Sequence, residues 1–238
     1  MYFLIETGPL SDNNGTVRDS MVQAATSIVT NRGKDHVEDL MKLCESTLES
    51  STNSSQSQDL VNEAVVILYG ALARHLPPGD ARVPQVVHRL LSTLSTPSES
   101  VQYAVAQCLP PLVRASSEQA SQYLQKTLDE TLHAKKYSAR RGAAYGLGGV
   151  IKGRGLSAMK ESRLLSTLRA ATENKKDPNE RQGAYLAYEL MSRLLGRIFE
   201  PYVIQLVPQL LVGFGDASTD VREACLDAAK TCFSSLSS

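Results

Sequence analysis

A glycine-rich run with basic residues at both ends is the stretch whose composition could bind phosphate. The run, RRGAAYGLGGVIKGRG, covers residues 140–155 and contains six glycines. A nucleotide-binding P-loop needs Gly-x-x-x-x-Gly-Lys-Ser/Thr after a strand, but here Ile151 precedes Lys152 and Gly153 follows it. The dinucleotide fingerprint Gly-x-Gly-x-x-Gly also fails, because its third glycine would fall on Ile151. The run is therefore not predicted to bind a nucleotide.

No other residues form a catalytic or metal-binding pattern. The four histidines are neither spaced as metal ligands nor placed beside a cysteine, so the sequence contains no zinc motif. The Gly-x-Ser-x-Gly elbow of serine hydrolases is also absent. The sequence thus predicts a protein that is not an enzyme and that has no cofactor, metal or small-molecule ligand.

Basic residues are concentrated in the middle of the chain, although the formal net charge is zero. Residues 126–200 contain fifteen lysines and arginines and eight acidic residues, whereas the rest of the chain contains ten and seventeen. The pairs Lys135–Lys136 and Lys175–Lys176 stand forty residues apart in turns of the same kind. In a stacked array these turns would lie about 10 Å apart. Such a row of lysines suits a phosphate backbone.

The candidate contact residues are the two lysine pairs and the basic residues of the glycine run, namely Lys135, Lys136, Arg140, Arg141, Lys152, Lys175 and Lys176. Arg140 and Arg141 fall in the first turn of a predicted helix, where one of them can instead pair with an acid of a neighbouring repeat. We expect no aromatic residues interleaved for base stacking, so contact with RNA would be to the duplex backbone and would read no sequence. The alternative is a solvated basic edge with no partner.

The elements that position these residues repeat along the chain. Six segments align without gaps, and their second residues are separated by 44, 40, 38, 41 and 41 residues, at Val17, Val61, Val101, Ala139, Glu180 and Val221. Three residues after each anchor the residue is always small, and eleven residues after it the residue is always apolar. These offsets trace one face of a helix. A period near forty residues is typical of HEAT and armadillo repeats.

A second set of apolar helical segments lies between the anchored ones, and turn residues separate the two sets. We therefore predict an all-α fold of antiparallel helix pairs, stacked into a right-handed α-α superhelix of about five and a half repeats. The chain is predicted to be a single array over residues 1–238, with approximate repeats at 1–31 (partial), 32–76, 77–115, 116–154, 155–197 and 198–238. Because neither end carries a polar capping repeat, we expect a slice of a longer array.

In this array the glycine run becomes the second helix of a repeat. Gly142, Gly146, Gly149 and Gly153 follow one another at intervals of three or four residues and are predicted to form a seam. Each interior glycine costs about 1 kcal/mol relative to alanine, so close approach of a neighbouring helix is the expected compensation. Gly153 and Gly155 are expected to end the helix. Gly148 has no explanation beyond its small size.

The pattern Asp-x-x-x-x-Val-Arg occurs twice, from Asp12 to Arg18 and from Asp216 to Arg222. This pattern is typical of the turn inside a HEAT repeat, where the acid and the arginine are expected to pair between adjacent repeats. Its predicted role is structural.

The cysteines lie in apolar helical patterns and are predicted to be buried free thiols, at Cys44, Cys108, Cys225 and Cys232. Free thiols favour a reducing, cytosolic compartment. No apolar run reaches the ~18 residues of a membrane span, and the N-terminal segment lacks the basic start of a secretory signal. We therefore expect a cytoplasmic protein with no membrane contact.

Several segments resemble a known family, among them FLIETGPLSDNNGTVRDSMVQAAT, CLPPLV, the glycine run, FEPYVIQLVPQLLVGFGD and VREACLDAAK. They are similar to the large HEAT-repeat translational activators of the general amino-acid control pathway. The resemblance covers essentially the whole chain and is looser at residues 154–162. It implies the central part of such a protein, near the stretch that is similar to the HEAT domain of fungal elongation factor 3.

The resemblance implies a non-catalytic scaffold that binds ribosomes. Members of the family work with an ATP-binding-cassette partner and help to activate the kinase that phosphorylates the α subunit of initiation factor 2 in amino-acid starvation. The kinase-binding segment lies far C-terminal in the family, so this chain is expected to reach the kinase only through segments outside it. The alternative is a generic protein-binding adaptor, similar to karyopherins or phosphatase scaffolds, that makes no contact with the ribosome.

Overall fold

The structure, a computed structural model, describes residues 14–50, 56–77 and 79–235 of the chain. Every regular element in those ranges is a helix, which confirms the all-α prediction. The second helices of the predicted repeats are α2 (Gly15–Arg32), α4 (Gln56–Ala73), α6 (Glu99–Ala115), α8 (Tyr137–Arg154), α11 (Pro178–Leu195) and α13 (Thr219–Ser235). The first helices are α3 (Val37–Ser50), α5 (Arg82–Thr93), α7 (Ala120–His133), α10 (Leu164–Glu173) and α12 (Glu200–Gly213).

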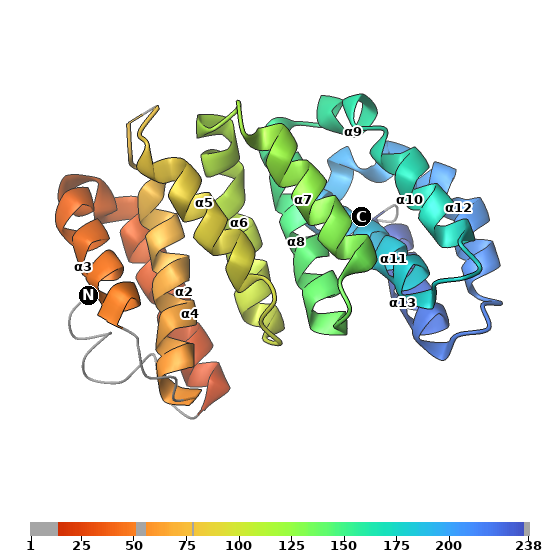
Figure 1. Cartoon of the computed structure of the whole chain (residues 1–238), viewed down its shortest axis with the longest axis horizontal. Coiled ribbons are helices and arrows are strands. Elements are labelled where there is room, and N and C mark those ends of the chain that lie inside the picture. Colours follow the sequence, from red (N-terminus) through yellow and green to blue (C-terminus); the bar gives the residue numbers. More distant parts are fainter. Residues whose placement is uncertain (1–13, 51–55, 78, 236–238) are drawn as a thin grey trace.

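The helix pairs stand side by side along the long axis of the molecule, from α3 and α4 at the left of Figure 1 to α12 and α13 at the right. Each second helix packs against the next one, in the order α2, α4, α6, α8, α11 and α13. The first helices pack against the second helices, and α5 and α7 each contact two of them. The second helices therefore form a continuous row, and the hydrophobic core extends along the whole array.

Helix boundaries follow the residues expected to start and stop helices. The α11 helix begins at Pro178, and the side chain of Asp177 accepts hydrogen bonds from the backbone N–H groups of Asn179 and Glu180. The α8 helix ends at Gly155, whose φ of 89° is a conformation that L side chains rarely adopt. The prediction that Gly155 ends the helix is confirmed.

The glycines of α8 lie where neighbouring helices come closest. A methyl group on Gly142 would overlap the carbonyl group of Leu94, and one on Gly149 would lie 2.7 Å from the carbonyl oxygen of Ala106 in α6. The predicted seam is confirmed. The prediction that Gly153 ends the helix is wrong, because α8 continues to Arg154 and Gly153 packs against α6. Gly148 also has a steric reason, since it faces a side chain of α11.

Two consecutive prolines occupy the interior of α6, a position that usually breaks a helix. Pro110 has no N–H group to donate to the carbonyl of Ala106, four residues earlier. This carbonyl is the one that Gly149 of α8 approaches. The prolines of one helix and the glycines of the next therefore meet at the same contact.

One helix was not predicted. The short α9 (Ser157–Glu161) lies between α8 and α10, in the segment where the family resemblance is loosest. The four cysteines are buried and free, as predicted, and burial raises the pKa of the Cys108 thiol to about 12. Within the described ranges, no helix combines the length and the apolar character that crossing a membrane requires.

Candidate nucleic-acid interface

The two lysine pairs lie in equivalent turns of adjacent repeats. Lys135 and Lys136 join α7 to α8, and Lys175 and Lys176 join α10 to α11. All four residues are exposed, and within the described part of the chain none of their ammonium groups makes an ion pair or a hydrogen bond. Because α8 and α11 pack against each other, both turns lie on the same edge of the array. We call this edge, made by the four lysines, the lysine edge.

Arg140 does not lie on the lysine edge but beneath it. Its exposed fraction is only 3%, and its guanidinium donates hydrogen bonds to the carbonyl oxygens of Ala134 at 2.8 Å and Lys135 at 2.9 Å. It also donates to the side chain of Gln182 in the next repeat. The role of Arg140 in the structure is to hold the turn that presents Lys135 and Lys136.

The same position of each repeat performs this role elsewhere in the array. Arg181 donates to the carbonyl oxygen of Asn174 at 2.7 Å, directly before Lys175. Arg222 donates to the carbonyl oxygens of Asp216 and Ala217. In α6 the residue at this position is the neutral Gln102. Its amide nitrogen donates to the carbonyl oxygens of Leu94 and Thr96 in the turn before α6. A polar side chain one residue after the anchor therefore fixes the turn within each of these repeats.

The predicted pairing between an acid and an arginine of adjacent repeats is present at Asp216. Its carboxylate accepts hydrogen bonds from Arg181 of the preceding repeat at 2.7 and 2.9 Å. These bonds hold the pKa of Asp216 below its ordinary value. The other copy of the pattern begins at Asp12, which lies outside the described residues.

Arg141 is also engaged within the protein. It donates to the side chain of Gln102 at 2.9 Å and to the carbonyl oxygen of Pro97 at 2.8 Å, and it forms an ion pair with Glu99 at 3.4 Å. Its guanidinium lies over the ring of Tyr137, 5.5 Å from the ring centre. Only 16% of its side chain is exposed. Arg141 therefore connects α8 to the preceding repeat.

Lys152 is exposed but lies away from the lysine edge. It stands in the last turn of α8, sixteen residues after Lys136, or about 24 Å along the helix at 1.5 Å per residue. In Figure 1 the α7–α8 turn lies at the lower edge of the array, whereas α8 ends at the upper edge, where α9 follows. The structure therefore brings four of the seven predicted residues together and separates Arg140, Arg141 and Lys152 from them.

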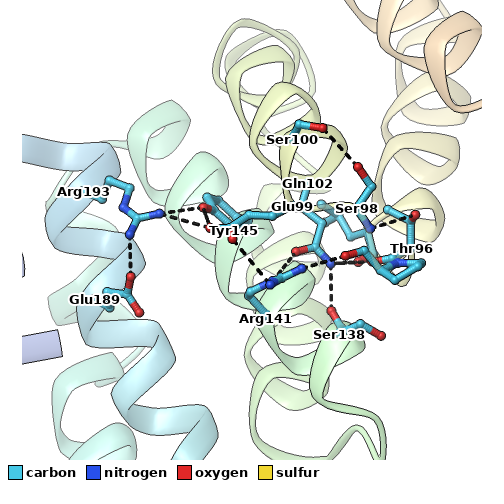
Figure 2. Close-up of polar contacts among 12 residues, drawn as sticks. Thr96, Ser98, Glu99, Ser100, Gln102, Ser138, Arg141, Tyr145, Glu189 and Arg193 are labelled. Atoms are coloured by element: carbon cyan, nitrogen blue, oxygen red, sulfur yellow. Dashed lines mark hydrogen bonds and ion pairs between the residues drawn. The ribbon is translucent and has the colours of Figure 1, made fainter. Parts of the chain in front are cut away.

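A polar cluster that the sequence did not reveal joins α6, α8 and α11 (Figure 2). The carboxylate of Glu99 accepts hydrogen bonds from Tyr145 at 2.6 Å and from Arg193 at 3.2 Å. Arg193 also donates to the hydroxyl of Tyr145 and to the carboxylate of Glu189. The hydrogen bond from Tyr145 and the two nearby arginines hold the pKa of Glu99 below its ordinary value. Burial instead raises the pKa of Glu189.

Comparison with known proteins gives consistent matches over the chain. Residues 1–74 match the model "Stalled ribosome sensor GCN1, HEAT repeats", and residues 140–238 match "EF3 N-terminal HEAT repeat". The chain is 42% identical over 228 residues to the human protein named "Stalled ribosome sensor GCN1" and 40% identical over 229 residues to the Saccharomyces cerevisiae "eIF-2-alpha kinase activator GCN1". It is 44% identical over 237 residues to the Arabidopsis thaliana "Protein ILITYHIA". These alignments cover 96% to 100% of the chain but only 8% to 9% of each relative.

Proposed function

Because the chain belongs by sequence to the family of the GCN1 HEAT-repeat proteins, we propose that it is a non-catalytic scaffold segment that contacts the ribosome through its lysine edge. Its relatives are named for sensing stalled ribosomes and for activating the eIF-2-alpha kinase. In this proposal the segment regulates translation in the cytoplasm during amino-acid starvation. The kinase is reached through segments outside this chain, and an ATP-binding-cassette protein is the working partner.

The observation that carries the ribosome contact is the set of four exposed lysines on two adjacent turns, whose ammonium groups have no ion pair or hydrogen bond among the described residues. Arg140 and Arg181 fix the carbonyl groups of these turns, so the lysines are held in place by the backbone. A preformed row of cations can neutralise phosphates of ribosomal RNA, and each neutralised phosphate releases counterions. Tyr137, directly after Lys136, is exposed, but its ring is covered on one side by the guanidinium of Arg141. The proposed contact is therefore to the phosphate backbone through the lysines and not to the base sequence.

Ribosome co-sedimentation across a salt series tests this proposal. The variant Lys135→Glu/Lys136→Glu/Lys175→Glu/Lys176→Glu removes the lysine edge. The control variant Lys34→Glu/Lys42→Glu/Lys126→Glu/Lys230→Glu makes the same change in net charge at dispersed positions. If the four lysines meet four phosphates, the slope of log K against log salt should be about −3 to −4 for the wild type and close to zero for the first variant. Equal binding and equal slopes for the wild type and the lysine-edge variant would contradict the proposed contact.

A further inference from the structure

A groove in the N-terminal repeats lies far from the lysine edge. Its volume is about 540 Å³, and it lies over α4 with α2 on one side and α6 on the other. The floor is made of small and apolar residues of α4, including Ala64, Ile67 and Ala71. The volume falls within the range of ordinary ligand sites.

The second helices that border the groove pack less closely on each other than those of the C-terminal repeats. In α8, Gly149 allows the backbone of α6 to come within contact distance. The corresponding position in α4, ten residues after the anchor, is Ala71, and no glycine of α4 lies against α2 in this way. The helices α2, α4 and α6 therefore leave open space where the later repeats are closely packed.

The width of the groove suits an extended chain better than a helix. Neighbouring helices pack at 8–10 Å, so α2 and α6 are at most about 20 Å apart across α4. A helix with side chains has a diameter of about 10–12 Å, and the two walls already occupy half of that separation. At one end the walls touch, because Ser100 of α6 donates a hydrogen bond to Asp19 of α2 at 3.3 Å. An α-helix does not fit between walls that meet in this way.

The walls carry groups that can pair with a peptide backbone. Gln23 of α2 and Gln107 of α6 are exposed lining residues, and among the described residues neither side chain makes a hydrogen bond. A carboxamide can donate to a backbone carbonyl and accept from a backbone N–H group. Asn31 of α2 uses its amide nitrogen to donate to Ser27, which leaves its carbonyl oxygen available.

The two ends of the groove have opposite net charge. Arg18, Asp19 and Glu63 line one end, which is net negative, and within the described part of the chain the two carboxylates accept hydrogen bonds from hydroxyl groups and form no ion pair. Arg74 lines the other end, is exposed, and has no hydrogen bond or ion pair among the described residues. Glu63 and Arg74 are eleven residues apart on α4, or about 16 Å at 1.5 Å per residue.

We propose that this groove binds an extended peptide segment of a partner protein that carries a basic and an acidic residue about five positions apart. An extended chain advances about 3.3 Å per residue, so five steps span the distance from Glu63 to Arg74. The basic side chain pairs with Asp19 and Glu63, and the acidic side chain pairs with Arg74. Between them, small side chains lie on the floor while Gln23 and Gln107 contact the peptide backbone. This inference does not depend on ribosome binding.

Fluorescence anisotropy with the full 238-residue chain tests the proposal. The probe is Lys-Ala-Ser-Ala-Ser-Glu, with a fluorophore on the N-terminal amino group and an amidated C-terminus, so that both ends of the peptide backbone are uncharged. Two matched peptides replace the glutamate by lysine or the lysine by glutamate. We expect the wild type to prefer the first peptide by about tenfold, since each mismatched peptide exchanges an attractive pair for a repulsive one. Equal binding of all three peptides, or no binding, would overturn the proposal.

Three variants distinguish the groove from other surfaces. Arg74→Glu should reverse the preference. The peptide with two lysines should bind more tightly to this variant than it binds to the wild type, which is a gain that an unfolded chain cannot produce. Lys42→Glu makes the same change in charge on α3, outside the groove, and should leave the preference unchanged. Ser27→Trp places a large side chain from an exposed position of the α2 wall into the groove and should abolish binding of all three peptides. An unchanged preference in Arg74→Glu, or full binding in Ser27→Trp, would contradict the proposed site.

Discussion

Arg193 of α11 donates a hydrogen bond to Glu99 of α6 at 3.2 Å, although 94 residues separate the two in sequence. Tyr145 of α8 lies between them, donates to the same carboxylate oxygen, and accepts a hydrogen bond from Arg193. In solenoids each repeat usually contacts only its neighbours. Here one carboxylate joins three consecutive repeats, so the second helices of the central array are connected by side chains as well as by packing.

The Glu99 cluster should contribute measurably to stability. We expect Glu99→Ala to lower the free energy of unfolding by about 1–2 kcal/mol, because the largely buried hydroxyl of Tyr145 loses its acceptor. Urea unfolding followed by circular dichroism measures this change. In a double-mutant cycle with Arg193→Ala the coupling energy should exceed about 0.5 kcal/mol. Strict additivity of the two substitutions would mean that the contact carries no energy.

The contribution of Glu99 should also depend on pH. Its pKa is lowered in the folded chain, so its stabilising effect is fully present above the pKa of the unfolded chain and is lost as the pH falls through the folded pKa. Relative to Glu99→Gln, the wild type should therefore be more stable at about pH 7, and this advantage should shrink below about pH 4.5. Unfolding curves of both proteins at several pH values test this.

Because α8 contacts its neighbours closely at its glycines, replacing one of these glycines by alanine should destabilise the chain. Although alanine favours helices, we expect Gly142→Ala to destabilise the chain by about 2–3 kcal/mol, since the added methyl group overlaps the carbonyl of Leu94. Gly215→Ala is the control, because a methyl group there meets only an ordinary contact, and its effect should stay within about 0.5 kcal/mol. Thermal unfolding of both variants checks the difference. Equal stability of the two would show that α8 can move away from its neighbour at little cost.

Arg140 should act on the lysine edge through the backbone. Arg140→Ala removes the donors to the carbonyls of Ala134 and Lys135, and we expect a loss of about 2–3 kcal/mol for this buried group. Amide hydrogen exchange in residues 134–137 should become faster. Lys136→Ala, which changes an exposed side chain of the same turn, should leave both stability and exchange nearly unchanged. Unaltered exchange in Arg140→Ala would contradict the role assigned to this residue.

The parts of the structure that depend on local pattern could be predicted from sequence. The forty-residue period placed both sets of helices, and the spacing of the lysine pairs placed them in equivalent turns. The roles of Arg140 and Arg141 could not be fixed in this way, because a basic residue in a first turn can face solvent or the preceding repeat. The Glu99 cluster could not be predicted from the sequence, because its members lie on three different helices and follow no regular spacing along the chain. Gly153 was assigned to the helix end because its contact with α6 is visible only in three dimensions.

The continuous row of second helices has a mechanical consequence. These helices are in contact from one end of the described array to the other, whereas successive first helices make few contacts with one another. The row of second helices therefore resists lengthening. Widening the gaps between successive first helices costs less free energy, because fewer contacts are lost. A force applied to the array, such as the pull of two large bodies held at its ends, would therefore bend it before stretching it. The chain is built as a flexible strip of nearly constant length.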